Sequence, residues 1–312
     1  CQKFDVSMWE FDKDVAVCLN NDRENKKLLS GYKFPKNLSV TNDLSECIKG
    51  SKIVLFAVPS FALRKLCENS KDFITKDMLL VSVIKGLEDA SFMSMTQIID
   101  DVIKNKRGVV ALSGPTHAEE VIKGVPTTIV AACKDLSLAE ETQKAFMTDS
   151  FRVYTNEDIV GVEIAAAAKN VIAIIAGISD GLNFGDNTKA AIITRGLAEI
   201  IRLGKKIGAQ EKTFSGLAGI GDLIVTCQSK HSRNRYVGEE IGKGRNVDDI
   251  VGGMTMVAEG VRNCKSIYHY AAKLEVEMPL TEELYKIIYE KANMKDSIKR
   301  LLGRKEKYEH WE

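Results

Sequence analysis

The stretch from Val160 to Ile178 constrains the fold most strongly, because it is apolar or small at all but three of its positions. The exceptions are Glu163, Lys169 and Asn170. A helix without a polar face is normally buried on all sides. The stretch therefore predicts a central helix around which other parts of the chain pack. Its charged and amide residues argue against a membrane span.

Lys169 lies in the middle of this predicted helix, and most of its neighbours at helical spacing are alanine. Such a face lets another backbone or a ligand approach closely. A lysine is rarely buried unless something offsets its charge, and a buried lysine loses its proton more easily. From the helix alone, two interpretations remain open. Lys169 is a proton-transfer group, or it is a structural lysine that pairs with a core carboxylate or extends to water.

Length and composition exclude several classes of protein. The chain has 312 residues, which suits two domains, and its net charge of +1 gives no general case for binding nucleic acid or a membrane surface. The seven cysteines are scattered and form no Cys-x-x-Cys pair, so we expect reduced thiols and a cytoplasmic protein. The four histidines show no metal-ligand spacing, and we expect no metal site.

The first half of the chain alternates short apolar runs with helical patterns. We expect strands at 4–11, 38–40, 52–58, 78–84, 109–112, 127–132 and 151–154, with helices at 14–30, 43–49, 61–69 and 92–104. This alternation predicts a parallel α/β layer with right-handed connections. After about Asn156 nearly every segment has a helical pattern. We therefore expect a nucleotide-binding α/β domain at 1–157 and an all-α domain at 158–312.

Three of the expected buried strands end in residues that suit a ligand site. They finish in Pro59-Ser60, in Lys85-Gly86 and in Gly114-Pro115-Thr116. Ligands bind open α/β sheets at the carboxyl ends of the strands. Each ending alone is ordinary turn chemistry. Three such strand endings in succession, one of which contains a lysine, favour a ligand-binding site.

No Gly-x-Gly-x-x-Gly loop follows a first strand in this sequence. In dinucleotide-binding folds an acidic residue closes the second strand roughly 20 residues after that loop, and Glu10 stands too near the start for it. We expect that roughly the first 25–30 residues of such a domain, with its first strand and glycine loop, lie outside this sequence. The alternative is a complete domain of another kind. Glu10 or Asp12 beside a ribose 2′-hydroxyl favours NAD over NADP.

A second group of polar residues lies in the helical half, within 219–226 and 231–235. A carboxylate from Asp222 beside Lys169 would orient the ammonium and keep it charged until it donates a proton. Ser232, Arg233 and Asn234 precede a helical segment and form a candidate phosphate cradle. The alternatives are a helix N-cap at Asp222 and a solvated basic turn.

Taken together, these segments resemble the NAD(P)-dependent glycerol-3-phosphate dehydrogenase family. The similar segments are 83–88, 113–119, 162–171, 185–189, 194–196, 219–223, 232–235 and 257–260. The resemblance runs over nearly the whole chain, and the order and spacing of the motifs make it specific. It implies a Rossmann-type α/β N-terminal domain and an all-α domain similar to the C-terminal domain of 6-phosphogluconate dehydrogenase.

The resemblance also implies a reaction, which is reversible hydride transfer between NAD(P)H and dihydroxyacetone phosphate. The product is sn-glycerol 3-phosphate, used in glycerophospholipid synthesis. The implied protein is a homodimer that acts on a small phosphorylated substrate, with no nucleic acid or membrane as partner. Its cofactor is NAD, with NADP as the alternative.

The resemblance assigns site residues as well. Lys169 matches the catalytic acid that protonates the substrate carbonyl. Substrate-binding positions match Lys85, Gly114, Thr116, Asp222, Ser232, Arg233 and Asn234. Cofactor-binding positions match Trp9, Glu10, Lys85, Ala118, Arg233, Val257 and Glu259. Many relatives have Trp followed by Arg where this chain has Trp9 and Glu10, and this difference favours NAD.

Two other functions fit part of the pattern. A related β-hydroxyacid-type dehydrogenase also pairs a Rossmann domain with a helical domain and uses a lysine. It would not need the sequence Ser232-Arg233-Asn234. A non-catalytic dinucleotide-sensing protein is the second alternative, and the absent glycine loop supports it.

Overall fold

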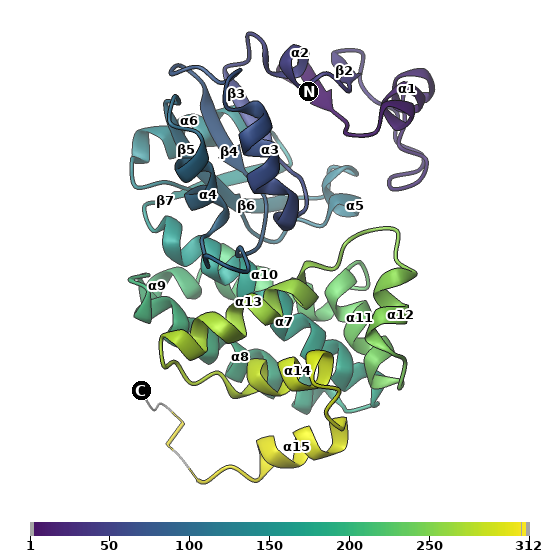
Figure 1. The fold of residues 1–312 in the computed structure, drawn as a ribbon, viewed down its shortest axis with the longest axis vertical. Helices are drawn as coiled ribbons and strands as arrows, with labels where there is room; N and C mark the ends of the chain where they lie inside the picture. The colour runs from purple at the N-terminus through teal and green to yellow at the C-terminus, as the bar shows by residue number, and fades with distance from the viewer. Residues whose placement is uncertain (1–2, 307, 310–312) are drawn as a thin grey trace.

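The computed structural model describes residues 3–306 and 308–309. Figure 1 shows a part built on a β-sheet above a part made of helices, and α7 (Ile159–Gly181) leads from the first into the second. The predicted fold class, a Rossmann-type α/β part followed by an all-α part, is confirmed.

The main sheet has five strands in the order β3-β4-β5-β6-β7. Their bounds are Ile53–Phe56, Leu79–Ser82, Gly108–Ser113, Thr127–Ala132 and Phe151–Asn156. All neighbouring pairs are parallel except β5 and β6, which are antiparallel. The expectation of a wholly parallel layer is therefore wrong for β6 and β7, which run opposite to β3, β4 and β5. The only helix between these two strands is α5 (Ala118–Val121), which is too short to carry the chain back across the sheet.

Both faces of the main sheet are covered, which explains its continuous apolar runs. On one face, Leu80 of β4 packs with α3 (Leu63–Ser70) and α4 (Met95–Val102). On the other, Leu79 and Val81 pack with α6 (Leu136–Phe146), a helix that the sequence reading did not identify. Because side chains alternate along a strand, β4 contributes to both cores.

A small lobe precedes the main sheet, and Figure 1 shows it at the upper right. Its strands β1 (Val6–Trp9) and β2 (Leu38–Thr41) pair in parallel and form a separate two-stranded sheet. The lobe also contains α1 (Lys13–Asp22) and α2 (Leu44–Ile48). We expected the first helix to reach residue 30, and this was wrong. Arg23 takes a left-handed conformation with φ of 53°, and its N–H donates to the Leu19 carbonyl, which ends the helix.

The helical part is built around α7, as its apolar sequence predicted. Against it pack α8 (Asp186–Lys206), α10 (Asp222–Gln228), α11 (Arg233–Gly242) and α13 (Glu259–Lys273). The remaining helices are α9 (Glu211–Phe214), the π-helix η2 (Leu217–Gly221), α12 (Val247–Gly252), α14 (Pro279–Tyr289) and α15 (Met294–Leu302). A short 3-10 helix, η1 (Ser60–Ala62), follows β3.

Glycines allow α11 to lie almost directly on α7. A Cβ atom on Gly238 would lie 1.9 Å from the carbonyl oxygen of Ile174, and one on Gly177 would lie 2.0 Å from that of Arg235. Among the described helices, α7 alone has the length and apolar composition of a membrane span. In this fold 83% of the most apolar 18-residue stretch of α7 is buried inside the protein. The helix is thus the interior element of this part.

Candidate active site

Lys169 and Asp222 form a buried ion pair where the two parts meet. Lys169 lies in the middle of α7 with 5% of its surface exposed, and Asp222 begins α10 with 1% exposed. The Lys169 Nζ donates to Asp222 Oδ1 at 2.6 Å and to the Thr226 hydroxyl at 2.5 Å. The structure therefore brings together the lysine and the carboxylate that the sequence paired.

Lys85 joins this pair from the carboxyl end of β4. Its Nζ donates to the second oxygen of Asp222 at 2.7 Å and to the Gly114 carbonyl at 2.9 Å. The Thr116 hydroxyl donates to the same carbonyl at 3.1 Å. A Cβ on Gly114 would lie 3.0 Å from the Ile129 Cα, so glycine allows β5 to end close beside β6. One carboxylate thus holds two ammonium groups, one from each part of the fold.

Burial and charge set the protonation of this cluster. Burial lowers the pKa of Lys169 to about 8, and the positive charge of Lys85 acts in the same direction, while the carboxylate of Asp222 opposes them. Burial on its own would raise the pKa of Asp222. The two ammonium groups outweigh burial and hold that pKa below its usual value. Two positive charges against one negative charge leave a centre that suits an anionic ligand or a developing oxyanion.

Ser60, at one of the predicted strand endings, and Asn263, which the sequence analysis missed, make hydrogen bonds near the strand ends. Ser60, after β3, donates its N–H and hydroxyl to the Glu259 carboxylate at 2.8 and 2.6 Å. The buried amide of Asn263 donates to the carbonyls of Lys85 and Ala167 at 3.3 and 3.2 Å. Its Oδ1 is buried and has no partner among the described residues. A free acceptor at a strand end fits a ligand that carries an amide N–H donor.

The predicted phosphate cradle lies at the start of α11, but its three residues differ in role. Ser232 caps the helix, since its Oγ accepts from the Arg235 N–H at 3.2 Å. Asn234 is buried, donates to Asn170 at 2.9 Å and accepts from the Gly260 N–H at 2.9 Å. Arg233 is exposed, and its Nη1 donates to the Val257 carbonyl at 2.9 Å. The hydrogen bond from Asn234 to Asn170, the residue next to Lys169, connects the cradle to the cluster of Lys169, Asp222 and Lys85, which we call the lysine centre.

A histidine pair lies close to the same centre. The rings of His117 and His231 are 6.0 Å apart between centroids. Burial lowers the pKa of His117, and the positive charge of Lys169 lowers it further, so the ring is neutral near pH 7. Within the described residues, no group of three histidine, cysteine or acidic side chains is arranged to hold a metal. We considered these histidines only as metal ligands at the sequence level and therefore missed His117.

The other predicted cofactor positions include Trp9 and Glu10 in the small N-terminal lobe and Ala118 directly after His117. Glu10 follows the carboxyl end of β1, and its carboxylate accepts from the Asp12 N–H at 3.1 Å. Trp9 donates its indole N–H to the Asn42 carbonyl at 3.1 Å. Ala118 and Val257 are exposed. An acid at one strand end and an unpartnered amide acceptor near another fit the ribose and nicotinamide portions of a dinucleotide.

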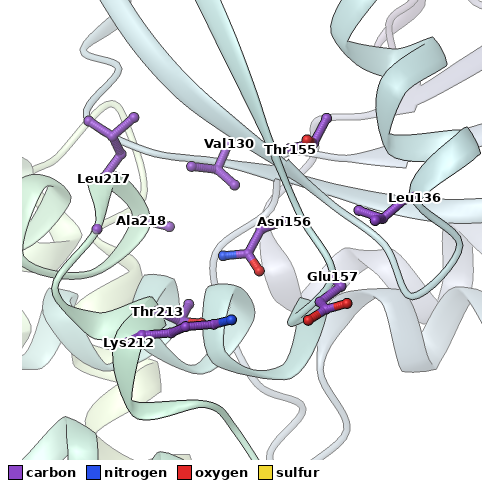
Figure 2. Close-up of a pocket in the computed structure, with 10 residues that line it drawn as sticks. Val130, Leu136, Thr155, Asn156, Glu157, Lys212, Thr213, Leu217 and Ala218 are labelled. Carbon is purple, nitrogen blue, oxygen red and sulfur yellow. The ribbon is translucent and has the colours of Figure 1, made fainter.

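A cavity of about 530 Å³ lies on another side of the domain junction. Figure 2 shows the side chains that line it, which come from β6, the start of α6, β7, the junction after β7, α9 and η2. None of the predicted site residues lines it. The candidate site is therefore defined by the chemistry around Lys169 and not by this cavity.

A doubly wound α/β part whose strand ends meet a buried lysine–carboxylate pair defines a two-domain, dinucleotide-dependent dehydrogenase. The family descriptions agree with this class. "NAD-dependent glycerol-3-phosphate dehydrogenase N-terminus" matches residues 2–139, and the corresponding C-terminus matches residues 158–299. The chain belongs to the NAD-dependent glycerol-3-phosphate dehydrogenase family, as the sequence motifs predicted.

Individual relatives cover almost the whole chain. A glycerol-3-phosphate dehydrogenase [NAD(P)+] of Chlorobium phaeobacteroides is 48% identical over 309 residues, which are 98% of this chain and 93% of the relative. One of Clostridium tetani is 44% identical, over 98% and 87% of the two chains. The crystal structure of glycerol-3-phosphate dehydrogenase from Coxiella burnetii has a TM-score of 0.92 and 32% identity, and covers 96% and 91%.

Proposed function

We propose that this chain catalyses reversible hydride transfer between NAD(P)H and dihydroxyacetone phosphate, giving sn-glycerol 3-phosphate for glycerophospholipid synthesis. The observation that carries the proposal is the cluster of Lys169, Asp222 and Lys85 at the junction of the two parts. Family membership supports the same reaction and NAD or NADP as the cofactor. When bound, the nicotinamide cofactor supplies or accepts the hydride.

Lys169 acts as the proton donor to the carbonyl oxygen of the substrate. With a pKa of about 8 the ammonium is mostly charged at pH 7 and still gives up its proton readily. The hydrogen bonds to Asp222 and Thr226 fix its position, which limits the reorganisation that the reaction needs. In the reverse direction, the neutral amine accepts the proton of the alcohol.

The other residues of the site bind and orient the substrate. Lys85, Gly114 and Thr116 form the strand-end side of the substrate site, and Asp222 accepts from a substrate hydroxyl. Arg233 supplies guanidinium donors to the phosphate, while Ser232 and Asn234 hold the start of α11 in place. The free N–H groups at the N-terminus of this ten-residue helix add to the attraction for the phosphate.

We further propose where the dinucleotide is held. Glu10 accepts from a ribose hydroxyl, which selects NAD. The remaining cofactor-binding residues are Trp9, Lys85, Ala118, Arg233, Val257 and Glu259. The hydrogen bonds from Ser60 to Glu259 support this assignment, because they tie a strand end to the start of α13. Asn263 is an additional candidate, through its unpartnered Oδ1.

The proposal also covers the bounds of the two domains, the localisation of the enzyme, its oligomeric state and its partners. Residues 1–157 form the cofactor domain and residues 158–312 the substrate domain, supported by the end of β7 at Asn156 and the start of α7 at Ile159. The protein is a cytoplasmic homodimer whose partner is the small phosphorylated substrate, with neither nucleic acid nor membrane involved. The net charge of +1 is consistent with this.

The direct test is an assay of NADH and NADPH oxidation with dihydroxyacetone phosphate and with unphosphorylated dihydroxyacetone. We expect oxidation that depends on the phosphorylated ketone and is faster with NADH. Equal rates with an unphosphorylated β-hydroxyacid substrate would favour the related dehydrogenase class. Binding of NADH without turnover of any ketone would favour a dinucleotide sensor.

A further inference from the structure

A second cavity, of about 410 Å³, lies within the helical part between α7, α8, α14, α15 and the segment after α15. In Figure 1 α14 and α15 lie in the lower half, farther from the sheet than α10, and α7 runs down from the sheet toward them. The cavity falls in the range of roughly 300–1,000 Å³ that is typical of small-molecule sites. Its walls are mostly apolar and include Ile175, Ile178, Leu182, Ile192, Ile298 and Leu301. None of the proposed active-site residues lines it.

One wall of this cavity carries a buried hydroxyl group. Ser179 of α7 is 2% exposed and lines the cavity, and its Oγ has no hydrogen-bond partner among the described residues. Buried hydroxyl groups nearly always have a partner, because leaving one unpaired costs free energy. A ligand with a polar group in this cavity would provide the missing partner.

Basic side chains gather at the same cavity. Its lining includes Arg195, Arg202, Arg304 and Lys305, against the carboxylates of Glu199 and Glu309. Burial lowers the pKa of Arg202; Glu199 and Glu277 oppose this effect, and the positive charges of Arg195 and Arg304 reinforce it. The three guanidinium groups are therefore close enough to repel one another. An anion at this position would relieve the repulsion.

Arg304 forms an ion pair with the Glu277 carboxylate, whereas Glu199 neutralises the remaining guanidinium groups only in part, because burial raises its pKa to about 7. The Glu199 carboxylate accepts from the backbone N–H of Leu280 at 2.6 Å and from the N–H of Thr281 at 3.2 Å, at the start of α14. Arg195 donates to the Glu309 carbonyl at 3.2 Å, which leaves further donors on its guanidinium. The cavity thus combines an apolar interior with donors that suit an anion.

We propose that this cavity binds a single-chain amphipathic anion, with its hydrocarbon chain between α7, α8 and α15 and its charged head at Arg195, Arg202 and Arg304. A carboxylate and a phosphate monoester present the same chemistry to these guanidinium groups. The site is separate from the proposed substrate site, although α7 contributes to both.

Isothermal titration calorimetry on the full chain tests this, with dodecanoate, dodecyl phosphate and dodecan-1-ol as probes below their micelle concentrations. We expect one molecule of either anion per chain, with an affinity that saturating NADH and dihydroxyacetone phosphate do not change. Dodecan-1-ol should bind about tenfold more weakly or worse, since it cannot pair with a guanidinium. Equal affinity for the alcohol and the anions would overturn the proposal.

Two variants locate the site, and catalytic activity reports that they fold. Ala191 is exposed and lines the cavity, so Ala191→Phe fills it from α8 without disturbing the core. Arg195→Gln removes one guanidinium, and Lys206→Gln, on the same helix but outside the cavity, is the matched control. We expect Ala191→Phe to abolish binding of both anions, Arg195→Gln to weaken it about tenfold, and the control to leave it unchanged.

A second copy of this chain is the competing occupant, since Leu302 at the cavity is 82% exposed. Light scattering on the same variants distinguishes the two. If the anions fail to bind and Ala191→Phe converts a dimer into a monomer, the cavity is a subunit interface and the proposal is wrong. Anion binding that Ala191→Phe leaves unchanged would place the ligand elsewhere and would also contradict it.

Discussion

Replacing Asp222 by asparagine keeps the shape of the side chain and removes the charge that holds Lys169 and Lys85 together. In the native site, burial lowers the pKa of Lys169 to about 8 even though Asp222 opposes the shift. At pH 7 an ammonium with that pKa is about nine-tenths charged. Without the carboxylate, burial and the charge of Lys85 act unopposed. The pKa of Lys169 should therefore fall well below 8.

The expected size of the effect follows from the contact distance. A neighbouring opposite charge within hydrogen-bond reach shifts a pKa by about 1–3 units, which would bring Lys169 to about 5–7 in Asp222→Asn. At pH 7 the charged fraction would then be between about one half and one hundredth. Ketone reduction needs the charged form, so kcat should fall about 2- to 100-fold at this pH from protonation alone, with any loss of substrate orientation added to it.

The assay is the pH profile of kcat for NADH oxidation with dihydroxyacetone phosphate, from pH 5.5 to 9. In the native enzyme kcat should decline above a pH of about 8, as Lys169 loses its proton. In Asp222→Asn the decline should begin at lower pH, so that acidification restores activity. Asp180→Asn is the matched control, because Asp180 also pairs with two cations, Lys189 and Arg235, but lies about three turns along α7 from Lys169. A profile in Asp222→Asn that keeps its decline near pH 8 would refute the reasoning.

Three further predictions concern substrate binding, packing and the pH dependence of stability. Arg233→Ala should raise KM for dihydroxyacetone phosphate about 10- to 100-fold with a smaller change in kcat, and kinetics with unphosphorylated dihydroxyacetone, which should not respond, provide the comparison. Gly238→Ala should cost about 3 kcal/mol or more in urea unfolding, because its Cβ would meet the Ile174 carbonyl, while Gly252→Ala, with no atom within 4 Å, should cost far less. Burial raises the pKa of Glu199 from 4.5 to about 7, so its contribution to stability is full below pH 4.5 and is lost as the pH rises through 7. The loss is at most about 3 kcal/mol, and a Glu199→Gln variant that still shows the full decline in unfolding free energy would contradict it.

The sequence predicted the contact between Lys169 and Asp222 because its signals are local. A lysine within an otherwise apolar helix, and an aspartate that follows two glycines, are both visible without any knowledge of the fold. Their meeting at 2.6 Å then follows from the packing of α10 on α7. The alternation of strands and helices in the first half gave the α/β class for the same reason.

What the sequence could not give depends on contacts between distant residues. Ser60 and Glu259 are 199 residues apart, and nothing in either segment indicates that the serine donates hydrogen bonds to the glutamate carboxylate. Asn263 occupies an ordinary position on an amphipathic helix, and its role depends on the strand end beside it. The reversed direction of β6 reflects how short α5 is, which a propensity pattern does not fix.

The measurement that tests the central claim most directly is kcat for dihydroxyacetone phosphate reduction in Lys169→Met, with NADH binding followed by fluorescence in the same protein. Methionine fills a similar volume without a proton to donate. General acid catalysis contributes about 100- to 10,000-fold, so kcat should fall by at least that factor at every pH while NADH still binds. Lys189→Met, which removes a lysine paired with Asp180 about three turns further along α7, should stay within a few-fold of the native rate. If Lys169→Met turns over dihydroxyacetone phosphate at nearly the native rate, Lys169 is not the proton donor and the proposed mechanism is wrong.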